Sequence, residues 1–309
     1  MKTKLEIILS FRLFLSDLFY FCSMDSKNKS FLFINVNGAL INLSSPVVMG
    51  IVNITPDSFY AGSRKQTETE IVERVHQLRN EGATIIDIGG YSSRPHAIFV
   101  DEKEEMRRLD FALPVLFREY PEAVVSVDTF RSGIARRCIE KYGVAIINDI
   151  SAGESDPEMF DTIARLKVPY IMMHMRGTPQ TMMQDTHYGN VQEEVFLYFA
   201  DKIEQLRARG IKDIILDPGF GFSKTTGQNY FLLNYLGNFS IFGLPLLVGF
   251  SRKAMIRNVL NCDIEDSLNG TTVLNVIALM KGANILRVHD VKAAVEAVCL
   301  FNQTKDSVP

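Results

Sequence analysis

The chain has 309 residues, of which 47% are hydrophobic and 22% are charged, so it can bury a sizeable core. This composition excludes a disordered, collagenous or polytopic membrane protein. Lysine and arginine number 33 and aspartate and glutamate 36, which gives a net charge of −3 and no broad positive field. We therefore expect no nucleic-acid partner and no membrane partner, and any anionic ligand must be held by a local cluster.

The cysteines Cys22, Cys138, Cys262 and Cys299 lie far apart and form no CxxC or metal-ligand spacing. This distribution favours buried thiols in a reducing compartment over a disulfide framework or a zinc site. We expect a cytoplasmic protein.

Residues 1–30 are interpreted as a poorly ordered N-terminal extension, and residues 31–309 as one domain. The stretch Met1–Cys22 is apolar, as in a signal peptide, but charged residues interrupt it and no small-residue cleavage site follows. These charges also argue against a membrane span. Met24 is an alternative start of the natural chain.

A β-hairpin is predicted at the start of the domain, because the apolar runs Phe31–Val36 and Ala39–Leu43 flank the turn pair Asn37-Gly38. Eight short apolar runs follow, each ending in polar residues and each separated from the next by a longer stretch suited to a helix. The predicted strands are Val47–Asn53, Thr84–Gly90, Val124–Thr129, Ala145–Ile150, Tyr170–Met175, Asp213–Gly219, Pro245–Ser251 and Ala283–His289.

Helical spacing of apolar residues is clear between these strands, in Glu68–Glu81, Val191–Arg209 and Thr271–Lys281. Buried strands that alternate with helices form parallel sheets with right-handed crossovers. Eight such units predict a (β/α)8 TIM barrel, a fold of roughly 250 residues, with the hairpin covering its N-terminal mouth. A doubly wound sheet is the alternative, but no glycine-rich fingerprint follows the first strand.

Polar residues stand at the predicted strand ends, where a barrel of this kind carries its active site. Any one of them could be a capped turn or a satisfied buried group. The loops Asn53–Gly62 and Gly89–Pro95 add hydroxyls, aromatic rings and a guanidinium, and loops of this kind can close over a substrate. Together they predict carboxylates and amides for a flat heterocycle and basic groups for an anion.

Ordered motifs carry a resemblance to a known family. They are Met49–Phe59, Asp87–Gly90, Ser92–Pro95, Ser126–Thr129, Ile147–Asp149, Met173–Met175, Asp217–Phe222, Ser251–Lys253 and Arg287–His289. In this order, over nearly the whole chain after about residue 31, the sequence resembles the dihydropteroate synthase family of pterin-binding barrel enzymes. The resemblance implies condensation of 6-hydroxymethyl-7,8-dihydropterin diphosphate with 4-aminobenzoate, giving 7,8-dihydropteroate and diphosphate with Mg²⁺ assistance. It also implies a homodimer.

The resemblance implies a role for each matching residue. The pterin-binding group comprises Asp87, Asp128, Asn148, Ile150, Met173, Asp217, Phe222, Gly249 and Lys253, with Asp217 in bidentate contact with the 2-amino group and the ring N–H. The diphosphate-binding group comprises Asn53, Arg94, Arg287 and His289, with Asn53 as the protein ligand of Mg²⁺. The 4-aminobenzoate group comprises Ser93, Phe222, Ser251, Lys253 and Ala254, and the catalytic residues are Asp57, Arg94, Asp128 and Lys253.

Simpler interpretations exist for these residues. The carboxylates could be strand-end caps, Met173 core packing, and Arg287 with His289 a surface ion pair. Alternation along a strand places Arg287 and His289 on one face, which favours a shared anion.

Four positions depart from the family pattern. Many members have Thr at Ser93, Glu at Tyr91, Asp at Ala61 and Ser at Ala254. The loss of a carboxylate at Ala61 and of a hydroxyl at Ala254 supports a second hypothesis, a non-catalytic pterin-binding paralogue. A third hypothesis is a methyltetrahydrofolate:corrinoid methyltransferase domain, which has no diphosphate to bind.

Overall fold

The computed structural model describes residues 32–54, 64–92 and 99–307. The predicted extension over residues 1–30 lies outside these ranges, as do Asp57, Ala61, Ser93 and Arg94. No helix among the described residues has both the length and the apolar run needed to cross a bilayer.

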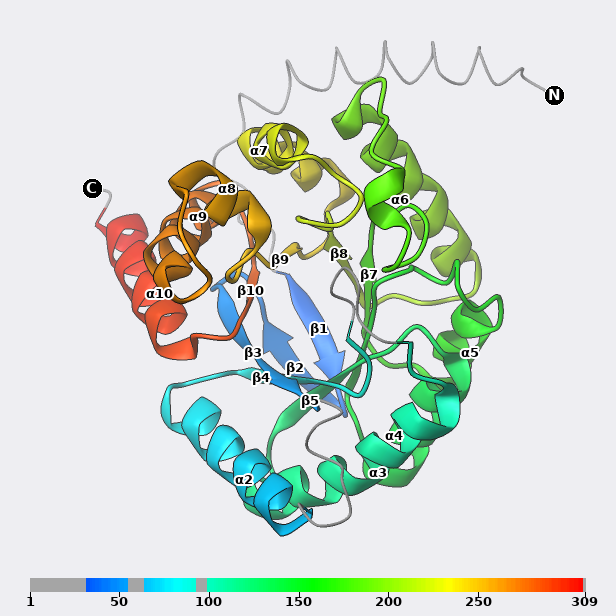
Figure 1. Ribbon diagram of the computed structural model, residues 1–309. Coiled ribbons are helices and arrows are strands. Elements are labelled where there is room, and N and C mark those ends of the chain that lie inside the picture. The colour runs from blue at the N-terminus through cyan, green and yellow to red at the C-terminus, as the bar shows by residue number, and fades with distance from the viewer. Residues whose placement is uncertain (1–31, 55–63, 93–98, 308–309) are drawn as a thin grey trace, which may run out of the picture. The chain divides into compact units, whose positions relative to one another are not determined.

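Eight parallel strands form the centre of the domain, inside a ring of helices (Figure 1). The strands lie in the order β8-β7-β6-β5-β4-β3-β10-β9. The ring closes between the two ends, because Leu216 and Leu246 form a parallel bridge and Leu216 N donates to Pro245 O at 2.9 Å. The strands are β3 Val47–Asn53, β4 Ile85–Gly89, β5 Val124–Asp128, β6 Ile146–Asp149, β7 Tyr170–Met173, β8 Ile214–Asp217, β9 Leu247–Val248 and β10 Ile285–Val288.

All eight predicted strands are present, and the predicted barrel is confirmed. The predicted run Pro245–Ser251 is reduced to two residues in β9, because the chain turns directly after it and Lys253 N donates to Phe250 O. The helices are α2 Arg64–Asn80, α3 Glu102–Glu119, α4 Ser132–Tyr142, α5 Met159–Leu166, α6 Val191–Ala208, α7 Thr226–Asn234, α8 Ala254–Leu260, α9 Leu268–Met280 and α10 Val291–Asp306. The short 3-10 helices are η2 Met182–Gln184, η3 Leu236–Phe242 and η4 Glu265–Ser267.

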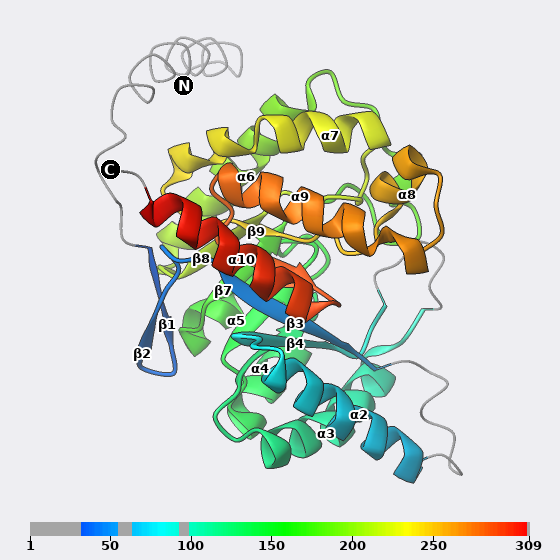
Figure 2. The same cartoon turned by 90° about the vertical axis from the view of Figure 1, so that its left-hand side faces the viewer.

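The hairpin β1 Phe33–Val36 and β2 Ala39–Asn42 lies at the end of the barrel where the strands begin (Figure 2). Asn37 and Gly38 both have positive φ angles, 50° and 86°, as the tight turn between two antiparallel strands requires. Ile34 and Val36 are buried and pack with Met49 and other apolar residues at the strand starts. The hairpin therefore covers the N-terminal mouth, as predicted.

Alternation along the strands explains why the barrel is both stable and polar at one end. Residues that point outward, such as Val48 and Ile86, pack against the helices in one large apolar cluster. The first inward-facing layer is apolar and includes Met49, Ile85, Ile146, Ile171, Ile215, Leu247 and Ile285. The next inward-facing residue, two positions further along the strand, is polar in four of these strands: Asp87, Asn148, Asp217 and Arg287. The interior thus changes from a packed core to a polar site within one pleat.

The cysteine prediction is correct in part. The free cysteines are Cys138, which is buried, Cys262, which is half-buried, and Cys299, which is exposed. Burial of all the thiols was therefore a wrong expectation, since the exposed face of α10 carries Cys299 into solvent.

Gly50 provides a test of the packing between β3 and its two helices. A Cβ at this position would lie 2.7 Å from Leu78 Cδ2 and 3.0 Å from Val291 Cγ2, both fully buried. Gly50→Ala should therefore lower the free energy of unfolding by about 1–3 kcal/mol, measured by urea denaturation. Gly227→Ala, in α7 with no atom within 4 Å of the new methyl, is the matched control and should leave stability unchanged or slightly raised. Equal losses in the two variants would contradict this account.

Candidate active site

A half-buried arginine joins two buried carboxylates at the C-terminal end of the barrel. Arg287 Nε donates to Asp87 Oδ2 at 2.7 Å, and Arg287 Nη2 donates to Asp128 Oδ2 at 2.8 Å. Asn148 Nδ2 also donates to Asp87 Oδ2, at 3.2 Å. These side chains come from β4, β5, β6 and β10, so the register of the strands brings together residues up to 200 positions apart.

The charges of this cluster are mutually dependent. Burial raises the pKa of Asp128 to about 7, and the facing charge of Arg287 opposes the shift. Burial works against the charge of Arg287, but Asp87 and Asp128 outweigh it and raise the pKa of the guanidinium. Asp87 Oδ1 is buried with no hydrogen-bond partner among the described residues, which leaves an acceptor ready for a donor on a ligand.

Asp217 ends β8 and is nearly fully buried. Its Oδ1 accepts a hydrogen bond from Gly219 N at 2.8 Å, which fixes the rotation of the carboxylate. Burial raises the pKa of Asp217, and the charge of Lys253 is the strongest opposing influence. The carboxylate is thus held in one orientation by its own loop and balanced by a lysine from the next unit.

Lys253 reaches the same site because the backbone reverses direction just before it. Arg252 has a positive φ of 56°, so its side chain turns away and binds both carboxylate oxygens of Asp290 at 2.9 Å. Lys253 instead directs Nζ to Phe220 O and lies over the Phe222 ring, 4.6 Å from its centre. Burial lowers the pKa of Lys253 to about 8, and Asp217 opposes this shift.

An apolar wall completes the pocket. Ile150, Met173, Met175 and Met182 form one buried cluster, and Phe130 and Phe222 pack against it. A flat bicyclic ring could lie against this surface while its edges meet the carboxylates. Gly249 lies between Arg287 and Lys253, where a Cβ would be in ordinary van der Waals contact with Arg287 O at 3.7 Å and Lys253 Nζ at 3.8 Å.

A hollow of about 320 Å³ lies beside β3 and α2 and is lined by Asn53, Arg74, His289 and Asp290 among other residues. Arg74 fixes its floor by donating to Ile51 O at 3.0 Å and to His289 O at 2.7 Å. His289 Nδ1 lies 2.9 Å from Ser251 Oγ, which links the predicted anion group to the loop after β9.

The donor set at this hollow fits a magnesium ion bound mainly by phosphate and water. Asn53 is exposed at the end of β3 and offers an amide oxygen. No cluster of three or more histidine, cysteine or acidic side chains suited to a metal occurs among the described residues. Mg²⁺ commonly keeps several waters and takes the remainder of its ligands from substrate phosphates, so a single amide ligand is compatible with it.

The structure thus gathers most of the predicted residues at one rim. Asp87, Asp128, Asn148 and Arg287 form one hydrogen-bonded cluster, so Arg287 is shared between the predicted pterin and diphosphate groups. Ala254 is exposed as the first residue of α8. Asp57, Ser93 and Arg94 lie outside the described residues, and their predicted roles stay predictions.

Arg74 and Met182 were missed by the sequence analysis. Arg74 lies on a helix with no motif, and Met182 lies in η2, so neither gives a local signal. Tyr91 is buried, packs edge-to-face on Phe130 and accepts a hydrogen bond from Gln180 Nε2 at 2.6 Å. Asp149, which is adjacent to Asn148, is structural, since it accepts hydrogen bonds from Tyr170 and Ser151.

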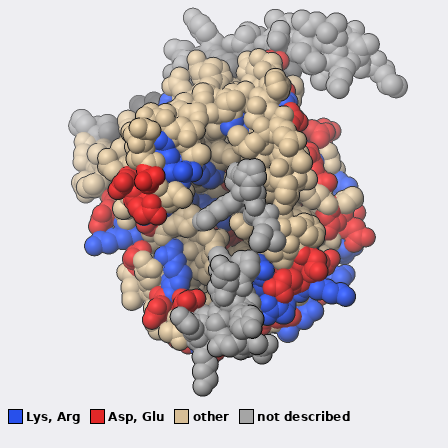
Figure 3. Space-filling view, viewed as in Figure 1, with Lys and Arg blue, Asp and Glu red and all other residues tan. Residues whose placement is uncertain are grey.

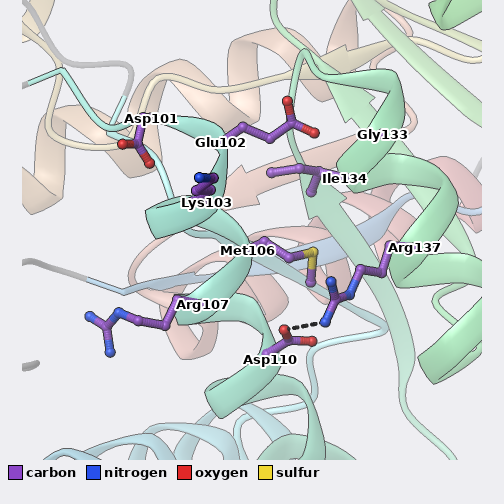
Figure 4. Close-up of a pocket in the computed structure, with 9 residues that line it drawn as sticks. All are labelled: Asp101, Glu102, Lys103, Met106, Arg107, Asp110, Gly133, Ile134 and Arg137. Carbon is purple, nitrogen blue, oxygen red and sulfur yellow. Dashed lines mark hydrogen bonds and ion pairs between the residues drawn. The ribbon is translucent and has the colours of Figure 1, made fainter.

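The space-filling view shows a hollow at the centre of the ring of helices, with lysine and arginine atoms inside it (Figure 3). A second groove, of about 770 Å³, lies outside the barrel between α3 and α4 (Figure 4). Its charged residues include the ion pair Arg137–Asp110. This groove has none of the buried polar groups found at the barrel mouth.

Comparison with known proteins agrees with this geometry. The family model for "Pterin binding enzyme" matches residues 49–289. Dihydropteroate synthase of Escherichia coli (strain K12) is 42% identical over 269 residues, covering 86% of this chain and 94% of that protein. The enzyme of Haemophilus influenzae is 38% identical over 275 residues, covering 88% and 98%.

Solved structures give the same result. The Yersinia pestis dihydropteroate synthase in a sulfonamide drug complex is 38% identical, with a TM-score of 0.81 over 89% of this chain and 100% of that chain. The Xanthomonas albilineans enzyme in complex with 7,8-dihydropteroate is 34% identical, with a TM-score of 0.78 over 90% and 100%. The chain therefore belongs to the family of pterin-binding enzymes.

Proposed function

We propose that this protein is a transferase of folate synthesis that joins 6-hydroxymethyl-7,8-dihydropterin diphosphate to 4-aminobenzoate, yielding 7,8-dihydropteroate and diphosphate. The observation that carries the proposal is the cluster of Asp87, Asn148, Asp128 and Arg287 beside Asp217 and Lys253. Relatives named dihydropteroate synthase match along nearly the whole described domain. A structural relative is described in complex with 7,8-dihydropteroate.

The pterin binds through its donor-rich edge. Asp217 accepts from the 2-amino group and the adjacent ring N–H, and Asp128 and Asn148 bind the same donor-rich edge. Lys253 donates to the carbonyl or a ring nitrogen, and Ile150, Met173 and Phe222 contact the ring faces. A site built to satisfy N–H groups in this way rejects analogues that lack them, because its buried acceptors would then be unpaired.

Bond breaking precedes bond formation in this proposal. The C–O bond to diphosphate breaks first, because the amine of an aminobenzoate is a poor nucleophile, and the electron pair leaves with the diphosphate. Asp87 and Asp128 face the positive charge that develops on the pterin, and Arg287 with His289 stabilises the departing anion. The amine then forms the C–N bond and loses a proton.

Magnesium is the proposed cofactor, and Asn53 is the protein ligand that would hold it. When bound, it supplies charge neutralisation for the diphosphate. Asp57 and Arg94 are proposed to act beside it from the first and second loops.

The aminobenzoate is proposed to bind near Phe222, Lys253, Ser251, Ala254 and Ser93. Its carboxylate would meet Ser251 Oγ and backbone N–H groups, since Ala254 offers no hydroxyl. The helix dipole adds little here because α8 has only seven residues.

We also infer a homodimer in the cytoplasm. Apolar side chains are exposed on consecutive helices of one side of the ring, including Phe231 on α7, Val259 and Leu260 on α8, and Val273 on α9. A patch of this kind supports association with a second copy. The described cysteines are free thiols, which suits a reducing compartment.

The deciding experiment measures dihydropteroate formed by purified protein with Mg²⁺ and both substrates. Product formation is expected, and slow diphosphate release without aminobenzoate should be detectable if the leaving group departs first. Dihydropterin binding without turnover would instead support the non-catalytic paralogue. Methyl transfer from methyltetrahydrofolate would support the corrinoid-dependent alternative.

Asp217→Asn should weaken the binding of 6-hydroxymethyl-7,8-dihydropterin by about 10- to 150-fold, measured by calorimetry. The change keeps the contact with Gly219 but removes the charge, and a hydrogen bond to a charged group contributes about 1.5–3 kcal/mol. Asp213→Asn is the matched control, because Asp213 lies just before the same strand and its carboxylate accepts from Asn35 N of the hairpin, at the other end of the barrel. Unchanged affinity in Asp217→Asn would remove this residue from the pterin site.

The affinity for dihydropterin should pass through a maximum between about pH 7 and pH 8. The pKa of Asp128 is raised to about 7, so the carboxylate needed for binding is lost as the pH falls through that value. The pKa of Lys253 is lowered to about 8, so the positive charge that strengthens its hydrogen bond to the pterin is lost as the pH rises through that value. Lys253→Arg should abolish the alkaline decline and retain the acid one. A flat profile from pH 5.5 to 9.5, a range of about four units, would contradict both assignments.

A further inference from the structure

Lys224 is a buried lysine that the proposed reaction does not use. It lies in the loop between β8 and α7, and the residue is 2% exposed. Its Nζ lies 3.0 Å from His174 Nδ1, 3.1 Å from Gly219 O, 3.1 Å from Phe222 O and 3.3 Å from His174 O. None of these contacts is a carboxylate, although buried lysines are rare unless they are paired with one.

The chemistry of these neighbours requires Lys224 to act as a donor. The surrounding carbonyl oxygens only accept, and an ammonium group only donates. Burial lowers the pKa of His174 well below its usual value, so its ring is neutral and Nδ1 can accept. Burial lowers the pKa of Lys224 to about 7, and the charge of Asp217 is the influence that opposes this shift. A protonated Lys224 and an ionised Asp217 therefore stabilise each other.

The loop that contains Lys224 has three residues with positive φ angles. Gly219 and Gly221, at 71° and 79°, adopt them at little cost, whereas Ser223, at 47°, has a side chain and is held in an unfavourable backbone conformation. A Cβ on Gly219 would lie 2.0 Å from His174 O, so this loop lies directly against the end of β7. Such a conformation persists only where surrounding contacts impose it, and Lys224 supplies contacts at both ends of the turn.

This loop controls two side chains of the proposed site. Gly219 N donates to Asp217 Oδ1, so the position of Gly219 sets the rotation of the carboxylate. Phe222, whose carbonyl oxygen is bound by Lys224, carries the ring that packs beside Met173. Lys224 lies outside the pocket but binds the carbonyl oxygens of the loop that carries Phe222 and orients Asp217.

We propose that Lys224 is a positioning residue, which ties the loop after β8 to His174 at the end of β7 and so orients Asp217 for binding of the pterin. This inference rests on the proposed function, because it assumes that Asp217 binds the pterin. It adds that Lys224 acts through Asp217 and makes no contact with substrate.

A double-mutant cycle tests this coupling in the full-length protein. Calorimetry measures the Kd of 6-hydroxymethyl-7,8-dihydropterin for wild type, Lys224→Met, Asp217→Asn and the double variant. Lys224→Met should raise Kd by about tenfold or more, the effect of misaligning one hydrogen bond to a charged group. On the Asp217→Asn background the same change should raise Kd by no more than about twofold, because the carboxylate that it orients is already lost.

Controls separate this result from a loss of fold. Lys212→Met removes an exposed lysine just before β8 and should bind like wild type. Urea denaturation of each variant confirms folding, and Lys224→Gln, which retains one donor group, replaces Lys224→Met if the latter does not fold. Restoration of part of the affinity in Lys224→Gln relative to Lys224→Met is also expected.

Three results would overturn the proposal. They are an unchanged Kd in Lys224→Met, losses that multiply in the double variant, and failure of both Lys224 variants to fold, which would make Lys224 only a stability element. Failure of the wild type to bind dihydropterin at all is a different result, because it would refute the proposed function itself.

Discussion

The ion pairs of Arg287 with Asp87 and Asp128 are the interaction on which the barrel mouth depends. A lone carboxylate buried at this depth would take up a proton, and two facing each other would repel. The guanidinium between them offsets part of this cost, because its charge opposes the rise that burial causes in the pKa of Asp128 and is itself stabilised by both carboxylates. Removing one member of a buried ion pair costs about 3–5 kcal/mol, so this site is also part of the fold.

The same arrangement explains how one pocket serves a cationic and an anionic portion of a substrate. In the proposed reaction the carboxylates face the position where positive charge develops, and the hollow lined by His289 and Asn53 receives the leaving group. Charge that moves from one part of the substrate to the other during bond breaking is therefore matched by fixed protein charges, and little reorganisation is needed.

The sequence predicted the fold because its signals are local. Each strand is a short β-branched run, and alternation within it specifies an apolar layer and then a polar one, as from Ile85 to Asp87. The positions of Asp128, Asn148 and Asp217 at strand ends followed from the same pattern. The fold therefore required no knowledge of distant contacts beyond the closure of the ring.

What the sequence could not predict are the contacts that depend on backbone direction and burial. The opposite orientations of Arg252 and Lys253 follow from one positive φ angle, which composition does not reveal. Arg74 and Lys224 look like ordinary surface residues in the sequence, and only the structure shows which carbonyl oxygens surround them. The pairing of Arg287 with Asp87 depends on strand register across 200 positions.

The closure of the barrel between β8 and β9 has a dynamic consequence. The other neighbouring strands of the ring share from two ladder pairs, between β9 and β10, to five, between β3 and β4, but here β9 meets β8 through a single bridge of Leu216 and Leu246. Local opening with the lowest free energy is expected where the fewest backbone hydrogen bonds hold an edge. Asp217 is the last residue of β8, and Lys253 follows β9. Local opening at this junction would therefore widen the pocket and allow a bulky bicyclic product to leave.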